Sequence, residues 1–322
     1  MIEEIRQEKG LLEKYSSLDI KQAKETFRLL ERSRTVLTAG NGTSYNAAYY
    51  LSLLFLKRGV PSIPVFSSEF SQFLSGNLSF GDTPTVIFSQ SGETSDALAA
   101  ARFCKQKEGT VISVCNVPGS TLPSLSDISF ITEAGEEKSV AATKSHFAQL
   151  LVSLSLYFAN QPDDYHKVLK EAVEGFLLLL SQENKVKEIA EDIGSRAIFL
   201  GSGLLYPVAR EASLKMKETC SLVTDAYPMR EFLHGPKQIL DDSWDVFLLS
   251  QDNDVRAELS KLSRNVTDIS DLLNSRFGIR IQDGLADSLV KVAFLQLLSY
   301  YKSVSLGLDP DKPSKLTKII SS

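Results

Sequence analysis

The sequence predicts an α/β protein built from two tandem domains, each a doubly wound parallel sheet. The chain has 322 residues, which is room for about two domains of ordinary size. Short β-rich runs alternate along it with longer helical patterns, as in parallel sheets whose strands are joined by right-handed βαβ crossovers. A strand, glycine-rich turn and helix also recur in the second half. These observations indicate one α/β unit that occurs twice.

The recurrence has one offset, 161 residues, which is the distance from Val36 to Ala197. It carries VLTAGNGTSY at Val36 onto AIFLGSGLLY at Ala197. The same offset carries TVIFSQ at Thr85 onto VFLLSQ at Val246. Two matches at one spacing indicate an internal duplication.

The first domain is expected over residues 1–165, with a surface helix at its N-terminus. Its strands are expected at residues 35–39, 62–66, 85–89, 110–116 and 128–132. Its main helices are expected at residues 44–57, 94–108 and 141–158. In such a sheet, ligands bind beyond the carboxyl ends of the strands, where loops lead into helix N-termini.

The second domain is expected over residues 166–322 and repeats this scheme. Apolar runs at 176–180 and 186–193 predict connecting helices near the boundary. The β-rich runs that predict its strands are residues 197–201, 221–224, 245–250 and 278–282.

Composition excludes several classes of protein. No apolar run reaches the roughly 18 residues that a membrane-spanning helix needs. A net charge of −5 argues against the basic surface of a nucleic-acid-binding protein. The three cysteines form no CxxC pair, and so they indicate neither a disulfide framework nor a metal site. The N-terminus lacks the pattern of a signal peptide. We therefore expect a cytoplasmic protein with neither a membrane nor a nucleic acid as partner.

The segment SQSGET, from Ser89 to Thr94, follows an apolar strand and precedes an alanine-rich helix. Such a turn exposes the first N–H groups of the helix, and its hydroxyl groups and Gly92 let an anion approach the backbone. The pattern predicts a phosphate cradle, although a capping box from Ser91 to Thr94 explains the local sequence equally well. In the second half Asp252 stands at the matching position, where its carboxylate would repel phosphate.

Other candidate residues gather in two further places. The turn GNGTSY at Gly40 puts Thr43 and Ser44 at the start of a helix, beside the first cradle in a parallel sheet. In a later helix one face carries Glu211, Lys215 and Glu218, which is also the pattern of a solvated, salt-bridged face. A fixed turn before Gly-Pro carries His234, and an imidazole suits proton transfer at neutral pH.

Taken together, the motifs resemble the double SIS (sugar isomerase) family, whose domains have a flavodoxin-like fold. The family includes the isomerase half of glucosamine-6-phosphate synthase and stand-alone deaminases. The resemblance extends over essentially the whole chain. Its motifs, in the family's order, are GNGTSY at Gly40, SQSGET at Ser89, AGEEKSVAATK at Ala134, REASLKMKE at Arg210, EFLHGP at Glu231 and DKPSKLTK at Asp311.

The resemblance implies a site for a small sugar phosphate. Its phosphate group would be held by Ser44, Ser89, Gln90, Ser91 and Thr94. The sugar would be contacted by Thr43, the backbone near Val140, and Glu211.

The resemblance also implies which residues carry the chemistry. The carboxylate of Glu218 would move a proton between C1 and C2, and Lys215 would stabilise the developing oxyanion. The imidazole of His234 would open the pyranose ring and reach into the site of a neighbouring subunit, so that the active form would be a homodimer. The tail lysine that meets the open-chain sugar would be Lys318, or Lys315 if the tail packs differently.

The reaction these residues imply is the deamination of glucosamine 6-phosphate, which with water gives fructose 6-phosphate and ammonia. The sequence contains no glutaminase module, so we expect no internal source of ammonia. The alternatives are an aldose–ketose phosphosugar isomerase, a deglycase that acts on fructosyl-amine 6-phosphates, and a sugar-phosphate sensor that performs no catalysis. No metal or other cofactor is expected.

Overall fold

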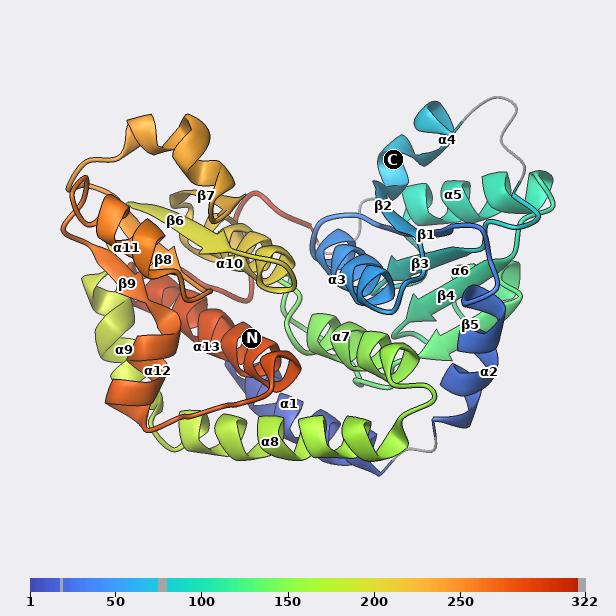
Figure 1. The fold of residues 1–322 in the computed structure, drawn as a ribbon, viewed down its shortest axis with the longest axis horizontal. Coiled ribbons are helices and arrows are strands. Elements are labelled where there is room, and N and C mark those ends of the chain that lie inside the picture. The colour runs from blue at the N-terminus through green and yellow to red at the C-terminus, as the bar shows by residue number, and fades with distance from the viewer. Residues whose placement is uncertain (18–19, 75–79, 318–322) are drawn as a thin grey trace. The chain divides into compact units, whose positions relative to one another are not determined.

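The computed structural model describes residues 1–17, 20–74 and 80–317, which form two compact units (Figure 1). The N-terminal unit contains Gly10–Glu137 and Ala142–Lys167. The C-terminal unit contains Met1–Lys9, Lys138–Ala141 and Val168–Leu316. Two short segments of the C-terminal unit therefore come from the first half of the sequence.

The N-terminal unit is built on a parallel sheet with the strand order β2-β1-β3-β4-β5. Its strands are β1 (Val36–Gly40), β2 (Ser62–Phe66), β3 (Thr85–Ser89), β4 (Val111–Cys115) and β5 (Ile128–Ile131). This confirms the five strands expected in the first half. The two faces are covered by α3 (Thr43–Lys57) with α7 (Lys144–Tyr157), and by α5 (Ser95–Gln106) with α6 (Thr121–Leu125) (Figure 1).

The C-terminal unit has a parallel sheet in the order β7-β6-β8-β9. Its strands are β6 (Arg196–Gly201), β7 (Val223–Pro228), β8 (Asp245–Leu248) and β9 (Val266–Asp268). The helices that lie wholly in this unit are α9 (Glu183–Asp192), α10 (Leu205–Cys220), α11 (Asn253–Leu259), α12 (Ile269–Phe277) and α13 (Gly284–Ser305). The chain also has α1 (Ile2–Ser16), α2 (Lys21–Leu30), α4 (Phe70–Phe73) and α8 (Pro162–Leu180).

The strand predicted at residues 278–282 is wrong, because the fourth strand of this sheet is β9. The segment instead joins α12 to α13, with Gly278 in the left-handed conformation at the end of α12 and Asp283 capping α13. Its alternating Ile279 and Ile281 imitate a strand, although Ile279 is buried in a connection. The strand expected at residues 221–224 starts later, at Val223, since Ser221 ends α10 with a positive φ.

Burial accounts for the composition of the strands and of α7. All residues of β1, β3 and β4 are buried, as expected where helices cover both faces of a parallel sheet. In α7 every residue from Lys144 to Leu156 is buried, so this stretch of the helix has no solvent-exposed face. Among the described helices, none is long and apolar enough to cross a membrane.

In both sheets the first strand ends in a glycine against which the backbone of the following helix packs closely. A Cβ on Gly40 would lie 2.5 Å from the backbone of Ser44, and a Cβ on Gly201 would lie 2.2 Å from the carbonyl oxygen of Leu205. Real Cβ atoms do not approach backbone atoms so closely, and thus only glycine lets the strand end fold directly under the helix. The two glycines are 161 residues apart, the offset of the repeat. The units therefore share strand order 2-1-3-4 and the geometry of the turn.

We predict that Gly40→Ala lowers the free energy of unfolding by roughly 1–3 kcal/mol, because the added methyl group must push the start of α3 away from β1. The measurement is a denaturant titration followed by fluorescence. The matched control is Gly10→Ala, since Gly10 is an exposed residue within α1 and has no atom within 4 Å of the position that a methyl group would take. That control should stabilise slightly; equal effects of both substitutions would contradict the close approach.

Candidate functional site

A small pocket at the carboxyl edge of the N-terminal sheet brings together three of the predicted phosphate ligands. Ser44 comes from the first turn of α3, and Ser89 and Thr94 come from the loop between β3 and α5. The Oγ atom of Ser89 lies 3.4 Å from Oγ1 of Thr94. The Ser44 Oγ accepts a hydrogen bond of 3.2 Å from Gln149. Two separate loops thus present hydroxyl groups to one space, as the sequence predicts.

No side chain caps the N-terminus of α5. Its N-cap residue, Thr94, makes no capping hydrogen bond. Ser91 accepts a hydrogen bond of 3.1 Å from the N–H group of Glu93, so the capping box from Ser91 to Thr94 does not form. The helix α3 also begins without a side-chain cap, because its N-cap is Gly42. These two helix starts suit an anion, which accepts hydrogen bonds from backbone N–H groups.

Two hydrogen bonds to backbone groups fix the conformation of the loop between β3 and α5. Ser89 Oγ accepts from the N–H group of Gly92 at 3.1 Å, and the carbonyl of Gln90 accepts from Asn116 at 3.1 Å. A Cβ on Gly92 would lie 2.1 Å from Ser120 Oγ, and its φ is +69°, so glycine is required there. In this arrangement Gln90 and Ser91 belong to the same loop but do not line the pocket.

The sequence reasoning missed a further hydroxyl group in the pocket, that of Ser67. Ser67 lines it and is buried, and its hydroxyl has no hydrogen-bond partner among the described residues. A buried hydroxyl without a partner is costly unless a ligand or water satisfies it. The available signal was position: Ser67 follows β2, and the last residue of β2, Phe66, pairs with Gly40 at the end of β1.

In the C-terminal unit, a side chain caps the start of the corresponding helix, α11. There the N-cap of α11 is Asp252, whose carboxylate accepts from the N–H group of Val255 at 3.2 Å and pairs with Arg230 at 2.7 Å. The N–H groups at this helix start are therefore satisfied by a carboxylate of the chain itself, unlike those of α5. That only the first half binds phosphate stays a prediction.

The predicted sugar contacts lie in different units. Thr43 is the first residue of α3, half-buried beside Ser44. Val140 belongs to the C-terminal unit, where its N–H group donates to the carbonyl of Asp311 at 3.0 Å.

In the C-terminal unit, α10 carries a buried cluster of two carboxylates and one ammonium group. Glu211 and Lys215 are almost completely buried, and the Lys215 Nζ lies 3.4 Å from Glu211 Oε1. The same Nζ also donates a short hydrogen bond to Glu218 Oε2. Glu218 is the most exposed member, with 21 % of its side chain accessible. The alternative of a solvated helix face is therefore wrong, because two of the three charges are inside the unit.

The carboxylate of Glu218 borders a pocket of about 550 Å³, a size typical of small-molecule sites. Its other wall is the tail that follows α13, including Lys312 and Lys315. Lys315, the substitute for the tail lysine, thus lines the same pocket as Glu218. The first choice, Lys318, lies outside the described residues.

The histidine predicted in a turn, His234, lies next to a segment that is anchored in the core. His234 ends a short 3-10 helix, Glu231–His234, and is exposed. Its neighbour Phe232 is fully buried and packs in a core cluster with Met229 and Trp244. Among the described residues, His234 has no hydrogen-bond or ion-pair partner, and no group of three or more potential metal ligands occurs.

Comparison with known proteins gives relatives for the whole chain. The SIS domain family matches residues 29–159. Glutamine–fructose-6-phosphate aminotransferase (isomerizing) from Sulfolobus acidocaldarius is 32% identical over 308 residues, which are 91% of this chain and 51% of that protein. The enzyme of the same name from Vibrio parahaemolyticus is 33% identical over 331 residues, covering 91% and 52%. The chain spans about half the length of these relatives.

Solved structures match over nearly the full length of both chains. The C-terminal domain of glucosamine-fructose-6-phosphate aminotransferase from Francisella tularensis has a TM-score of 0.84 and 27% identity, covering 97% of each chain. Glucosamine-6-phosphate deaminase from Thermotoga maritima has a TM-score of 0.81 and 24% identity, covering 99% and 98%; this likeness concerns the fold alone. The fold and the family match agree, and residues 29–159 belong to the SIS domain family.

Proposed function

We propose that this chain is a glucosamine-6-phosphate deaminase. It would convert glucosamine 6-phosphate and water to fructose 6-phosphate and ammonia. The observation that carries the proposal is the cluster on α10, in which buried Lys215 holds Glu218 at the edge of a pocket. A positioned carboxylate next to an ammonium group suits the transfer of a proton beside a carbonyl, where a base and a partner for the oxyanion are both needed.

The phosphate group is assigned to the cradle of the N-terminal unit. The hydroxyl groups of Ser44, Ser67, Ser89 and Thr94 and the uncapped starts of α3 and α5 supply the donors. The chain's net charge of −5 does not attract an anion from a distance, so local donors must provide the affinity. Relatives at 30–33% identity are named for fructose 6-phosphate, which is the product of the proposed reaction. Gln90, Ser91 and Thr43 would adjust the loops around the substrate.

The proposed steps conserve atoms and protons. His234 gives a proton to the ring oxygen and takes up the proton that the C1 hydroxyl loses, which opens the ring. Glu218 then removes the proton from C2 while Lys215 stabilises the negative charge on O1. Glu218 returns that proton to C1, and the amino group gives one of its protons to O1, so that C2 becomes an imine. The C2 imine that results adds water and loses ammonia, leaving the ketone. Glu211 is buried and does not line this pocket, so it would hold Lys215 in place rather than contact the sugar. Lys318 or Lys315 of the tail would meet the open chain.

The three cysteines of the sequence take no part in the proposed steps. All three are buried. Burial raises the pKa of Cys104 and Cys220 to about 11 and that of Cys115 to about 12, so none is an accessible thiolate. Unpaired, buried thiols also suit a reducing compartment, in line with the proposed cytoplasmic location.

The proposal includes a homodimer and a duplicated chain. The exposed His234 on its rigid turn would act in the site of a second copy. The common strand order and turn geometry support an origin of the two units from one ancestral SIS domain, after which the second kept Glu218 and His234 and lost the phosphate cradle to Asp252.

We predict that Glu218→Gln lowers kcat for ammonia release from glucosamine 6-phosphate by about 10²–10⁴-fold, because the amide cannot accept the C2 proton. A coupled ammonia assay measures the rate. The matched control is Glu174→Gln, which removes an exposed carboxylate elsewhere on a helix and should leave kcat unchanged. Full activity in Glu218→Gln would show that another group is the base.

A pair of substitutions at Thr94 tests the cradle. Asp and Asn cap helices equally well, so Thr94→Asp and Thr94→Asn should fold alike and differ in one negative charge. We expect the Asp variant to weaken competitive inhibition by inorganic phosphate about tenfold to hundredfold relative to the Asn variant, because like charges meet in the pocket. Equal inhibition constants in the two variants would place the phosphate site elsewhere.

Mixing two inactive variants tests whether His234 acts across subunits. An equal mixture of His234→Ala and Glu218→Gln chains, unfolded and refolded together, should recover about a quarter of wild-type activity. Half of the dimers are then mixed, and each mixed dimer has one site with both native residues. Each variant refolded alone is the control. A mixture that stays as inactive as its components would show that both residues serve the same chain or that His234 has another role.

A further inference from the structure

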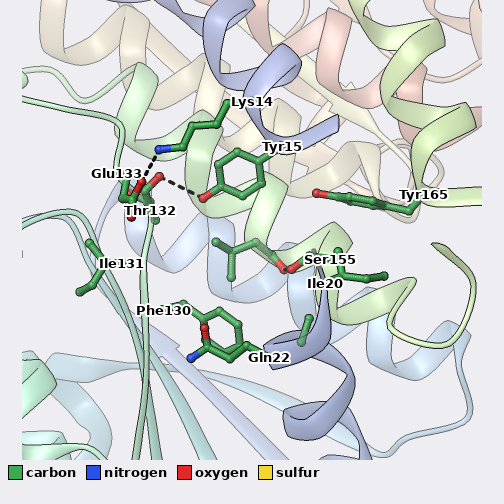
Figure 2. Close-up of a pocket in the computed structure, with 12 residues that line it drawn as sticks. Lys14, Tyr15, Ile20, Gln22, Phe130, Ile131, Thr132, Glu133, Ser155 and Tyr165 are labelled. Atoms are coloured by element: carbon green, nitrogen blue, oxygen red, sulfur yellow. Dashed lines mark hydrogen bonds and ion pairs between the residues drawn. The ribbon is translucent and has the colours of Figure 1, made fainter. Parts of the chain in front are cut away.

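Pockets outside the predicted sites occur in both units. The one in the N-terminal unit has a volume of about 180 Å³, and its lining residue Tyr165 has no accessible surface (Figure 2). A ligand there could not reach the hydroxyl group of that residue. The pocket in the C-terminal unit is larger, about 380 Å³, and falls within the range of small-molecule sites.

The larger pocket lies where the strand order of its sheet reverses. The order is β7-β6-β8-β9, so the chain leaves β6 toward one side of the sheet and continues from β8 on the other. Leu205, which follows β6, and Ser250 and Gln251, which follow β8, line the pocket. In open α/β sheets, ligands bind beyond the carboxyl ends of the strands at such a switch point. The pocket with Ser44 and Ser89 has the equivalent place between β1 and β3.

A buried ion pair forms part of the wall. Lys291 is almost completely buried, and its Nζ donates to Asp287 Oδ2 at 2.6 Å, to the carbonyl of Leu249 at 2.7 Å and to Ser270 Oγ at 2.8 Å. These bonds use all three hydrogens of the ammonium group. Asp287 keeps 23 % of its side chain accessible. Its other oxygen, Oδ1, has no donor among the described residues and is not fully buried, so a ligand can reach it.

The surroundings of Asp287 favour a ligand hydroxyl over a ligand ammonium group. Burial raises the pKa of Asp287, Lys291 lowers it, and the carboxylates of Asp268 and Glu171 raise it further. A ligand cation would meet the ammonium group that is already there. A hydroxyl group donates a hydrogen to the carboxylate without adding charge, and it can accept from Ser270, whose own hydrogen is donated to no described residue.

Arg280 adds a positive charge to the same wall. Its Nε donates to Asn274 Oδ1 at 2.7 Å, which orients the guanidinium group. Within the described part of the chain Arg280 forms no ion pair, and both of its Nη groups are free. The parallel N–H groups of a guanidinium match the two oxygens of a carboxylate. The wall therefore suits a ligand that has an anionic end and a hydroxyl end.

The helix starts at this pocket favour a carboxylate over a phosphate group. Asp268 and Asp283 cap α12 and α13, whose first turns contribute Ser270 and Gly284 to the wall. A phosphate dianion would find these N–H groups satisfied and would be repelled by the capping carboxylates. A carboxylate carries a single charge, for which Arg280 suffices. The starts of α3 and α5, in contrast, have no side-chain caps.

We propose that this pocket binds a small hydroxylated carboxylate, such as a sugar acid, with its carboxylate on Arg280 and a hydroxyl group on Asp287. Lys291 is a positioning residue that fixes Asp287 and does not touch the ligand. The lining residues all belong to the C-terminal unit, and none is adjacent in sequence to a residue outside the described ranges. The site is independent of the proposed deaminase chemistry.

The test measures the binding of gluconate, sorbitol and hexanoate to the full chain by isothermal titration calorimetry. Sorbitol lacks the carboxylate of gluconate, and hexanoate lacks its hydroxyl groups. Gluconate should bind saturably with a Kd of about 1 mM or below. The other two should each bind about tenfold more weakly or worse, because each loses a charge-assisted hydrogen bond. Absence of saturable gluconate binding, or equal binding of either partial analogue, would overturn the proposal.

A pair of arginine substitutions locates the carboxylate. Arg280→Gln should weaken gluconate about tenfold and leave sorbitol unchanged. The matched control is Arg276→Gln, which removes the same charge from an exposed residue of α12 that pairs with Glu188 and does not line the pocket. Equal effects of the two substitutions would contradict the site. Asp287→Asn would leave Lys291 buried without a counter-charge and endanger folding, so hexanoate tests that contact instead.

Inorganic phosphate separates this site from the proposed phosphate cradle. At constant ionic strength phosphate should leave the affinity for gluconate unchanged. Thr94→Asp should leave it unchanged as well, because Thr94 lies in the other unit. Displacement of gluconate by phosphate, or loss of gluconate binding in Thr94→Asp, would show that gluconate occupies the cradle and would overturn the proposal. These results do not depend on whether the chain releases ammonia from glucosamine 6-phosphate.

Discussion

The N–H groups at the start of a helix need hydrogen-bond acceptors, and the helices of this protein meet that need in different ways. Several starts are closed by the chain itself. Asp252, Asp268 and Asp283 cap α11, α12 and α13, and buried Glu137 accepts from the N–H groups of Thr143 and Ser145 at α7. At α3 and α5 no side chain caps the helix. Those two starts lie at neighbouring strands, where an anion can satisfy both.

The buried charges of α10 likewise need partners. A buried ammonium group requires an opposite charge, and Lys215 has two, from Glu211 and Glu218. Lys215 contacts both carboxylates and so links buried Glu211 to Glu218, the more exposed member, which borders the pocket. The arrangement fixes the direction of the Glu218 side chain through a residue that cannot itself reach solvent. A helix whose charged face was solvated would leave the carboxylate free to rotate.

Much of the fold and of the site could be predicted from local patterns. Strand and helix periodicity located all five strands of the first sheet, and Gly40 and Gly201 marked two equivalent turns. The prediction failed at residues 278–282, because Ile279 and Ile281 alternate as in a strand, although the segment is a connection between helices in which Ile279 is buried. Periodicity reports which side chains are buried, but it does not report what buries them.

The sequence by itself determined the order of elements, the glycines that let strands turn into helices, and the polar residues that follow β1 and β3. These are local properties, set by spacing and by backbone sterics. Only the tertiary structure decided that Ser67 joins Ser44, Ser89 and Thr94 in one pocket, that Glu211 and Lys215 are buried, and that the Tyr165 hydroxyl is left without a partner. Each of these facts depends on which distant segments pack against a side chain, and burial sets the cost of an unpaired polar group.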